Sequence, residues 1–300
     1  MDSHLKYIAC VSDLKKFVEA TGATDVVIGL SGGVDSSLVA TMAVDAFGPA
    51  HVHGVLLPGP YSTDHASADA LALAGNLGID TMTLSIKGAY DAFAAELKDV
   101  CGEAFDGTTS QNIQARCRMI CLMALSNAHG WLLLNTGNKS EAAMGYATLY
   151  GDMAGAYAPI GGLYKTDVYL LCRWRNEQAA YALGQAHAAL YNQTMLGLEP
   201  LKKQPIPRHV INKPASAELA PDQTDEDSLG IEYAVLDNIL VAHLERGKDA
   251  QALVEAGFAQ EDVDLVLKKL AASAFKQALY APTSRYEFYA EDAEGSAWSY

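Results

Sequence analysis

The stretch Val26-Val27-Ile28-Gly29-Leu30-Ser31-Gly32-Gly33-Val34-Asp35-Ser36-Ser37 decides how this chain folds. Its apolar start predicts a buried strand that ends at about Leu30, and a helix begins near Val34. The glycines between them permit a tight turn with no Cβ in the way of a ligand. Their backbone N–H groups then converge at a helix N-terminus, where the partial positive charge favours an anion such as phosphate.

Asp35 lies beside this anion site, where its carboxylate would repel a phosphate. A bridging Mg²⁺ would explain a carboxylate at this position. The dinucleotide pattern Gly-x-Gly-x-x-Gly does not fit the loop, and the Gly-Lys-Ser/Thr ending of a Walker loop is absent. The alternative interpretation is a structural turn, with Asp35 as a first-turn acid that the helix dipole favours.

The loop Ser31-Gly32-Gly33-Val34-Asp35-Ser36 resembles that of the ATP pyrophosphatase family, whose Ser-Gly-Gly-x-Asp-Ser loop binds the pyrophosphate of ATP. The resemblance implies an enzyme that cuts ATP between the α- and β-phosphates and adenylylates a substrate oxygen. It also implies the adenine nucleotide alpha hydrolase-like fold.

Strands and helices alternate along the chain. After the strand at 26–28, we expect strands at 51–57, 81–86 and 131–135, and helices at 12–19, 34–46, 67–77, 89–100 and 111–129. This order predicts an α/β fold, a doubly wound parallel sheet with helices on both faces. Ligands of such sheets bind beyond the carboxyl ends of the strands, which is where the loop at 31–36 would lie.

Composition favours a cytoplasmic enzyme. Half of the 300 residues are hydrophobic, yet no apolar run approaches the ~18 residues of a spanning helix. The N-terminus shows no signal-peptide pattern, and five scattered cysteines make a disulfide framework unexpected. The formal charge of −15 disfavours nucleic-acid and membrane partners.

A second polar, glycine-containing region follows the expected strand at 131–135. Taken alone, Glu141 would be a helix-start acid on a surface loop. Beside the loop at 31–36, Glu141 could instead supply a second carboxylate to an Mg²⁺ held by Asp35. Lys165 could neutralise phosphate charge that develops during adenylyl transfer.

Six blocks in order narrow the resemblance to the NAD synthetase family. They are the loop at 29–37 and residues 111–116, 136–141, 150–155, 159–166 and, taken together, 213–219 with 224–230, and the likeness covers most of residues 10–280. Members convert nicotinic acid adenine dinucleotide to NAD. ATP adenylylates the nicotinate carboxylate, and ammonia then displaces AMP.

The resemblance assigns site residues. ATP would be held by Gly29, Leu30, Ser31, Gly32, Gly33, Val34, Asp35, Ser36, Thr136, Lys165 and Ser216, and Mg²⁺ by Asp35 and Glu141. Asp35, Glu141 and Lys165 would be the catalytic residues. The dinucleotide would contact Asn112, Arg116, Glu141, Tyr146, Ala147, Thr148, Leu149, Asp152 and Lys276. Residues 214–230 resemble a mobile loop that closes over the substrates; read without the resemblance, they fit a solvated acidic linker equally well.

The sequence departs from the family pattern in three places. Ala156 and Gly162 stand at positions that are commonly acidic, and a C-terminal basic cluster is reduced to Phe275-Lys276-Gln277. Residues 176–205 form a longer link than usual, which predicts a helical insertion within a single domain spanning 1–300.

The nitrogen source and the assembly are further expectations. The loop begins at residue 29, which leaves no room for a glutaminase ahead of it, so we expect free ammonia or a separate glutaminase subunit. The broad apolar stripe of 111–129, with the resemblance, predicts a homodimer.

Two other functions stay open. One is another ATP pyrophosphatase, either an amidotransferase synthetase or a tRNA-thiolating enzyme, and the other is a non-catalytic protein that binds adenine nucleotides. A tRNA-thiolating enzyme would be expected to have a basic surface and cysteines near the ATP loop, and this sequence has neither. Mere nucleotide binding would not need the second carboxylate, Glu141.

Overall fold

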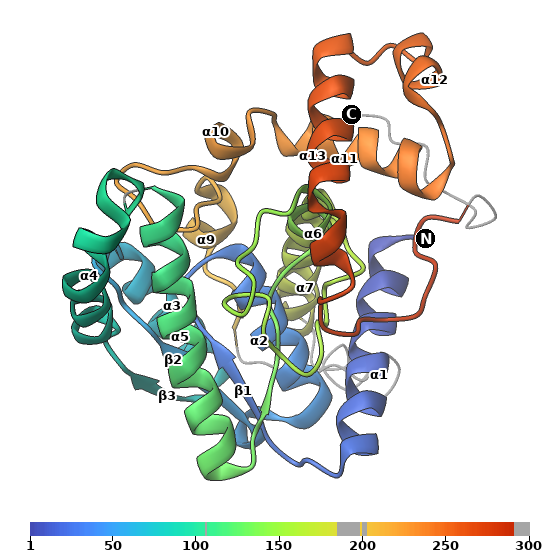
Figure 1. Ribbon diagram of the computed structural model, residues 1–300. Coiled ribbons are helices and arrows are strands. Elements are labelled where there is room, and N and C mark those ends of the chain that lie inside the picture. Colours follow the sequence, from blue (N-terminus) through green and yellow to red (C-terminus); the bar gives the residue numbers. More distant parts are fainter. Residues whose placement is uncertain (106, 185–198, 200–202, 291–300) are drawn as a thin grey trace.

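A parallel sheet lies at the centre of the molecule (Figure 1). The computed structural model describes residues 1–105, 107–184, 199 and 203–290. Within them the strands are β1 (Val26–Gly29), β2 (Val52–Leu56), β3 (Asp80–Thr83) and β4 (Leu132–Leu133), in the order β3-β2-β1-β4. Strand order reverses between β1 and β4, which confirms the doubly wound prediction.

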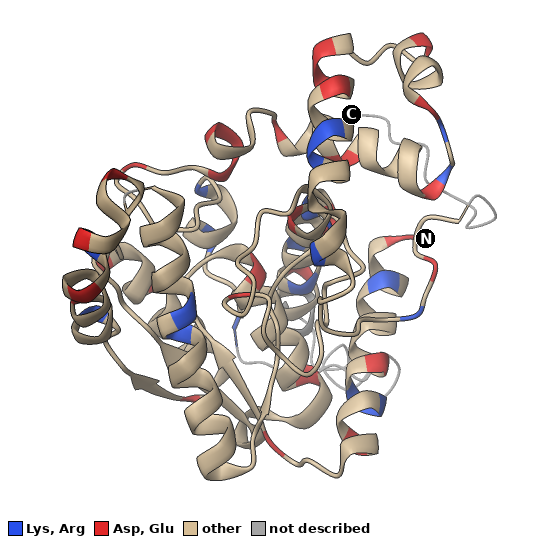
Figure 2. Ribbon diagram, viewed as in Figure 1, with Lys and Arg blue, Asp and Glu red and all other residues tan. Residues whose placement is uncertain are grey.

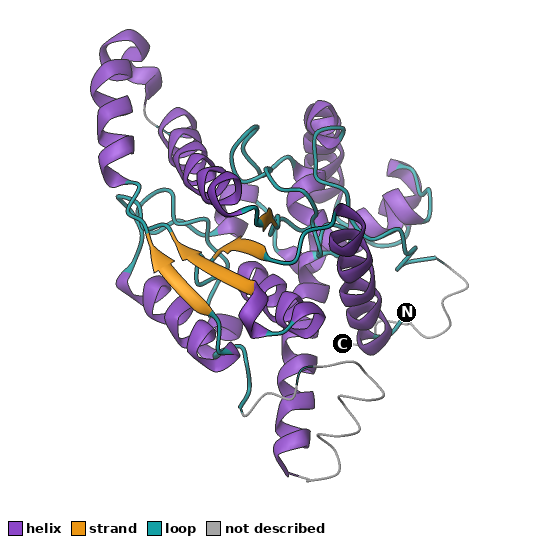
Figure 3. Ribbon diagram, turned by 90° about the horizontal axis from the view of Figure 1, so that it is seen from below, coloured by secondary structure: helices purple, strands orange, loops and turns teal. Residues whose placement is uncertain are grey.

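Helices cover both faces of this sheet, as Figure 3 shows. Val26 and Ile28 of β1 pack in one buried cluster with α1 (Ser3–Thr21), α2 (Val34–Phe47), α3 (Asp64–Leu77) and α7 (Lys165–Gly184). Val27 points to the opposite face and packs with α4 (Lys87–Cys101) and α5 (Thr108–His129). Strand residues therefore alternate between two buried faces, as the nearly continuous apolar run requires.

A separate apolar cluster lies beyond the carboxyl ends of the strands. It is built mainly from α6 (Lys139–Met144), α10 (Asp225–Leu229), α11 (Tyr233–Leu240), the π-turn η3 (Val241–Glu245), α12 (Ala250–Glu255) and α13 (Gln260–Gln277). The short helix α9 (Arg208–Asn212) packs with α7, in the sheet's own core. Two one-turn helices, η1 (Pro49–His51) and η2 (Gly102–Phe105), complete the described elements.

Several element ends differ from the sequence predictions by a few residues, and two of these differences have a clear physical cause. The first helix begins at Ser3, well before residue 12, because the Asp2 side chain caps it by accepting from the Leu5 N–H. The third strand ends at Thr83 rather than residue 86, since Ile86 has turned into the start of α4 and is buried there.

The predicted insertion at 176–205 is only partly within the described residues. Its first part continues α7 to Gly184, while 185–198 and 200–202 lie outside them. Glu199 is held between two buried side chains: its N–H donates to Asp45, and its carbonyl accepts from Arg175. Arg175 also forms an ion pair with Asp45 at 2.8 Å, which fixes this link against α2.

Acidic residues outnumber basic ones in the chain as a whole, 36 to 21, and α10 carries three acids in its first turn (Figure 2). In the described part of the chain, no helix is both long and apolar enough to cross a membrane.

Candidate active site

The loop after β1 has the geometry of an anion site. Gly32 has φ +77°, and a Cβ there would lie 2.2 Å from the Ala66 carbonyl oxygen, so only glycine fits against α3. Gly33 begins α2 without a side-chain cap. The first N–H groups of α2 therefore lack a capping side chain, as a phosphate-binding helix start requires. Ser36 and Ser37 shape the turn by donating to the Gly33 carbonyl.

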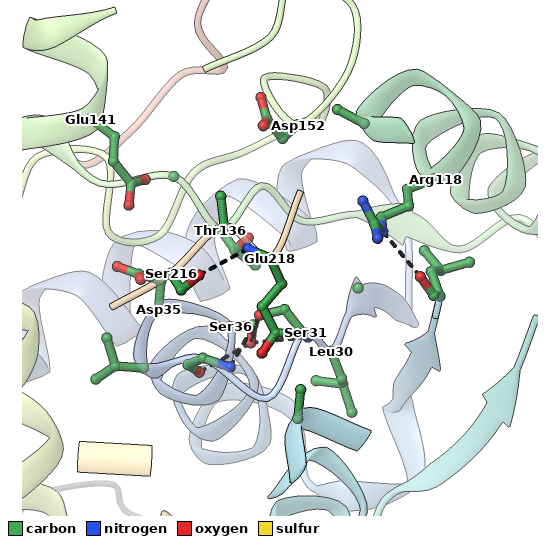
Figure 4. Close-up of a pocket in the computed structure, with 18 of the residues that line it drawn as sticks. Leu30, Ser31, Asp35, Ser36, Arg118, Thr136, Glu141, Asp152, Ser216 and Glu218 are labelled. Atoms are coloured by element: carbon green, nitrogen blue, oxygen red, sulfur yellow. Dashed lines mark hydrogen bonds between the residues drawn. The ribbon is translucent and has the colours of Figure 1, made fainter. Parts of the chain in front are cut away.

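This loop lines a cavity of about 320 Å³ at the carboxyl ends of β1, β2 and β4. Figure 4 shows Asp35, Glu141, Thr136 and Ser216 around it. All the predicted ATP-contacting residues line the cavity except Gly32, which faces α3 instead. The volume is within the usual range for small-molecule sites, roughly 300–1,000 Å³.

The three predicted catalytic residues lie together, with Lys165 bonded to the other two. Its Nζ lies 2.6 Å from Asp35 Oδ2, 3.1 Å from Glu141 Oε1 and 3.8 Å from Asp225 Oδ2. Asn138 donates to the other oxygen of Asp35 at 2.9 Å. Burial disfavours a charged Lys165, but Asp35 and Glu141 outweigh it and raise its pKa, so the ammonium persists. Burial raises the pKa of Glu141 to about 8, although Lys165 opposes this.

A buried carboxylate supports Lys165 from behind. Asp237 accepts from the Ser140 hydroxyl at 2.5 Å and from the Thr166 N–H at 2.8 Å, and Ser140 in turn accepts from the Lys165 N–H. Burial raises the pKa of Asp237 to about 6. These contacts fix the first turn of α7, and with it the point from which the Lys165 side chain extends.

The predicted dinucleotide-binding residues meet around the loop 145–152. Asp152 accepts from the Thr148 N–H at 2.6 Å, and Asn112 accepts from the Thr148 hydroxyl at 2.8 Å. Arg116 donates to the Leu149 carbonyl, and Lys276 donates to two carbonyls at the start of the loop. Of the predicted set, Glu141, Tyr146, Ala147 and Asp152 line the cavity. Asn112, Arg116, Thr148, Leu149 and Lys276 hold the loop and do not line the cavity, so their contact with the dinucleotide stays a prediction.

The segment 213–225 crosses the cavity mouth. Glu218 accepts from the N–H and the hydroxyl of Thr63, and the Leu219 carbonyl accepts from Gln114. The Gln223 side chain donates to the Tyr146 hydroxyl. These bonds tie the segment to α3, α5 and the loop 145–152, so it lies over the cavity in this structure; its mobility stays a prediction.

A family model described as NAD synthase matches residues 7–280. The chain belongs to this family. It is 42% identical to the glutamine-dependent NAD(+) synthetase of Thermotoga maritima over 90% of this chain and 43% of that protein. For the glutamine-dependent NAD(+) synthetase of Synechocystis sp., identity is 40% over 99% of this chain and 48% of that protein. The chain therefore spans about half the length of these curated relatives.

Solved structures of similar proteins share the fold. An NMN synthetase from Francisella tularensis has 27% identity and a TM-score of 0.71, covering 92% of this chain and 96% of that one. An NH3-dependent NAD synthetase from Campylobacter jejuni has 26% identity and a TM-score of 0.68, with the same coverage. These likenesses confirm the predicted family and fold class.

Three residues at which the sequence departs from the family pattern do not line the cavity. Ala156, Gly162 and Phe275 are absent from its walls. Gly162 packs against the Phe288 ring, which a Cβ would approach to 3.1 Å, and Phe275 is 63% exposed.

The cavity residues that the sequence prediction did not assign to the site include Arg118, Asp225 and Tyr280. Arg118 donates to the Leu57 carbonyl, and burial lowers its pKa. Asp225 is buried, unlike the neighbouring acids of α10, and burial raises its pKa. A signal for Arg118 existed, since it lies two residues after Arg116, the last residue of the block 111–116. Asp225 was hidden within an acidic run that reads as solvated, and nothing in the sequence marks Tyr280.

The donor set suits Mg²⁺. Asp35 and Glu141 share one ammonium, so two carboxylates face the same point of the cavity. Within the described residues, no three His, Cys, Asp or Glu side chains form a ready metal site. That matches a cation that takes one or two carboxylates together with substrate phosphates.

Proposed function

We propose that this chain amidates nicotinic acid adenine dinucleotide to NAD, using ATP and ammonia and releasing AMP and pyrophosphate. Its membership of the NAD synthase family supports this. The observation that carries the proposal is the position of Lys165, which bonds Asp35 of the loop 31–36 (the phosphate loop) and Glu141 beside the loop 145–152 (the acceptor loop). One cation thus stands where the two substrates would meet.

The reaction has two steps. A nicotinate oxygen attacks the α-phosphorus of ATP, forming an acyl adenylate as the bond to pyrophosphate breaks. Ammonia then adds to the acyl carbon, and the bond to the AMP oxygen breaks. In both steps negative charge develops on phosphate oxygens, which Lys165 and the N–H groups at the start of α2 are placed to stabilise.

Bound Mg²⁺ would be held by Asp35 and Glu141 and would neutralise pyrophosphate charge. The segment 213–225 would exclude water, which otherwise hydrolyses an acyl adenylate. Asp225 has one buried carboxylate oxygen without a hydrogen-bond partner in the described structure, and this oxygen is suited to accept from ammonia.

We propose that nitrogen arrives as ammonia. The relatives from Thermotoga and Synechocystis are glutamine-dependent, and glutamine hydrolysis by such enzymes needs a reactive nucleophile. None of the five cysteines lines the described cavity, and burial raises the pKa of Cys10, Cys117 and Cys172. A separate glutaminase remains a proposed partner.

The test is a product assay with ATP, Mg²⁺, an ammonium salt and nicotinic acid adenine dinucleotide. NAD, AMP and pyrophosphate in equal amounts are expected, and Asp35→Asn is the inactive control. Nicotinic acid mononucleotide is run in parallel, because one similar structure is an NMN synthetase. Faster turnover of the mononucleotide, or AMP without either amide, would overturn the proposal. Glutamine replaces ammonium in a further arm, which should give no NAD.

We also propose a cytoplasmic homodimer that pairs through α5. Ile120 is 53% exposed on that helix, and Arg116 beside it is exposed. A second copy would cover this apolar side chain and bring Arg116 toward a neighbouring site. Light scattering of the purified protein tests it; a fully active monomer would contradict it.

A further inference from the structure

The Tyr280 hydroxyl is a buried polar group without a partner. It lines the cavity of the candidate active site, yet no described residue hydrogen-bonds to it. Leaving a buried hydroxyl unpaired is unfavourable, so native proteins do so rarely. Four side-chain atoms share this condition in the described structure: Gln114 Oε1, Tyr157 OH, Asp225 Oδ1 and Tyr280 OH. Of these residues, only Asp225 and Tyr280 line the cavity.

The chain holds Tyr280 firmly in this position. On one side, Lys276 at the end of α13 donates to the carbonyls of Gly145 and Ala147 at 2.8 and 2.6 Å. On the other side, Ala158 donates to the Pro282 carbonyl at 2.8 Å. Both ends of the short segment 276–282 are therefore bonded to the acceptor loop and to the backbone that follows it. Because the segment is bonded at both ends, the unpaired hydroxyl is not explained by a poorly held chain, and it is available to a ligand.

The surroundings make this hydroxyl a donor. Burial, and then the negative charges of Asp152 and Glu141, raise the pKa of Tyr280. The phenol therefore keeps its proton at neutral pH, and it can donate a hydrogen bond but not act as a base. Glu141, one of the proposed metal ligands, and Asp152, in the loop 145–152, line the same cavity as Tyr280, and both act electrostatically on its hydroxyl.

We propose that the Tyr280 hydroxyl donates a hydrogen bond to the carboxylate oxygen of an aromatic acid acceptor, the oxygen that becomes the carbonyl of the acyl adenylate. This inference rests on the proposed amidation. When ammonia adds, its lone pair forms the C–N bond and the carbonyl electron pair moves onto that oxygen. The pair then returns and breaks the bond to the AMP oxygen, while one N–H proton leaves to water. The hydrogen bond from Tyr280 strengthens as the oxygen gains charge.

Tyr157 provides a matched control. Its hydroxyl is also buried and unpaired, but the residue stacks on Phe17 of α1 and does not line the cavity. Tyr280→Phe and Tyr157→Phe thus remove the same group at two places. Neither change should lower the melting temperature, because each removes an unsatisfied polar atom.

The experiment compares the two variants with the wild type. Calorimetric binding of nicotinic acid adenine dinucleotide and kcat/KM for the same acceptor are measured, together with binding of ATP. Tyr280→Phe should weaken acceptor binding about 5-fold and lower kcat/KM by roughly 10- to 100-fold, with ATP binding unchanged. Tyr157→Phe should match the wild type in all three. Equal values for Tyr280→Phe and the wild type would overturn the inference.

The two proposals fail separately. A wild-type protein that makes no NAD overturns the proposed amidation, while acceptor binding still tests Tyr280 because it needs no turnover. Weakened ATP binding in Tyr280→Phe would place the hydroxyl at the nucleotide and would equally overturn its assignment to the acceptor.

Discussion

The two ends of the cavity differ in the kind of group that the protein places there: paired charges at the phosphate end, and a neutral, unpaired hydroxyl toward the acceptor end. At the phosphate end, Lys165 pairs with both Asp35 and Glu141, and Asn138 bonds the remaining oxygen of Asp35. Toward the acceptor end, Tyr280 has a buried hydroxyl with no partner in the described structure. Around Lys165 the charged groups are paired before any ligand arrives, apart from one unpaired oxygen of Asp225, whereas the Tyr280 hydroxyl leaves a hydrogen bond for the ligand to complete. We expect substitutions at the first end to affect chemistry and those at the second to affect acceptor recognition.

The largest effect is expected from Asp35→Asn. The variant keeps an oxygen for Asn138 but loses the charge that partners Lys165 and would hold Mg²⁺. NAD formation should fall by about a thousandfold, the upper range for loss of one electrostatic contact at a reacting centre. The control is Asp64→Asn, an exposed first-turn acid of α3. A folded Asp35→Asn protein with normal turnover would remove the distinction between the two ends.

Asp237→Asn tests the support behind Lys165. Burial raises the pKa of Asp237 from 3.8 to about 6, so the folded protein retains this proton to higher pH than the unfolded chain. Its contribution to stability is complete below about pH 4 and is lost as pH rises through about 6. Over that window the unfolding free energy of the wild type should fall relative to the variant, by roughly 3 kcal/mol at most.

Urea unfolding of both proteins between pH 4 and 7 measures this difference. At neutral pH the variant should also lose activity, about 10-fold, because an amide cannot accept from both Ser140 and Thr166 as the carboxylate does. A difference in stability that stays constant with pH would show that Asp237 is already ionised throughout.

The phosphate end could be predicted from the sequence because its signal is local. An apolar strand, two glycines, an acid and a helix follow one another within twelve residues, and each follows from backbone preferences. Lys165 could not be placed that way, since 130 positions separate it from Asp35. Only the family resemblance joined the two, and the structure brings them to 2.6 Å.

The sequence says less about the acceptor end, for a physical reason, and the dinucleotide contacts expected there stay predictions. Asn112 and Arg116 were expected at the dinucleotide, but a residue type does not show whether a side chain faces a ligand or the backbone beside it. Here Asn112 bonds Thr148, and Arg116 bonds the Leu149 carbonyl. Tyr280 reaches the cavity only through the packing of α13, which no spacing in the sequence reveals.

Asp152→Asn probes the acceptor end by charge alone. Asparagine keeps an oxygen for the Thr148 N–H, so the loop 145–152 should retain its shape. We expect kcat/KM for the dinucleotide to fall about 10-fold with ATP binding unchanged, in line with loss of a charged hydrogen-bonding group. Asp222→Asn in the covering segment is the control; Asp222 is exposed and has φ +50°, which asparagine tolerates. If ATP binding weakens instead, Asp152 contributes to the nucleotide site, and the cavity does not separate into a phosphate end and an acceptor end.

The smallest expected effect comes from Glu218→Gln, which separates two roles of the covering segment. The Glu218 carboxylate accepts from the N–H and the hydroxyl of Thr63, and it also lines the cavity. As an acceptor it holds the segment closed, but as a charge it opposes a bound triphosphate. Glutamine keeps one acceptor oxygen and removes the charge.

ATP should therefore bind roughly threefold tighter to the Glu218→Gln variant at low salt, the scale of a partly exposed charge contact, and the gain should shrink as salt is added. Calorimetry at two salt concentrations measures this, with Glu232→Gln as an exposed control. Weaker ATP binding that is the same at both salt concentrations would mean that the bond to Thr63 dominates. Closure of the segment, unlike charge repulsion, does not depend on screening by salt.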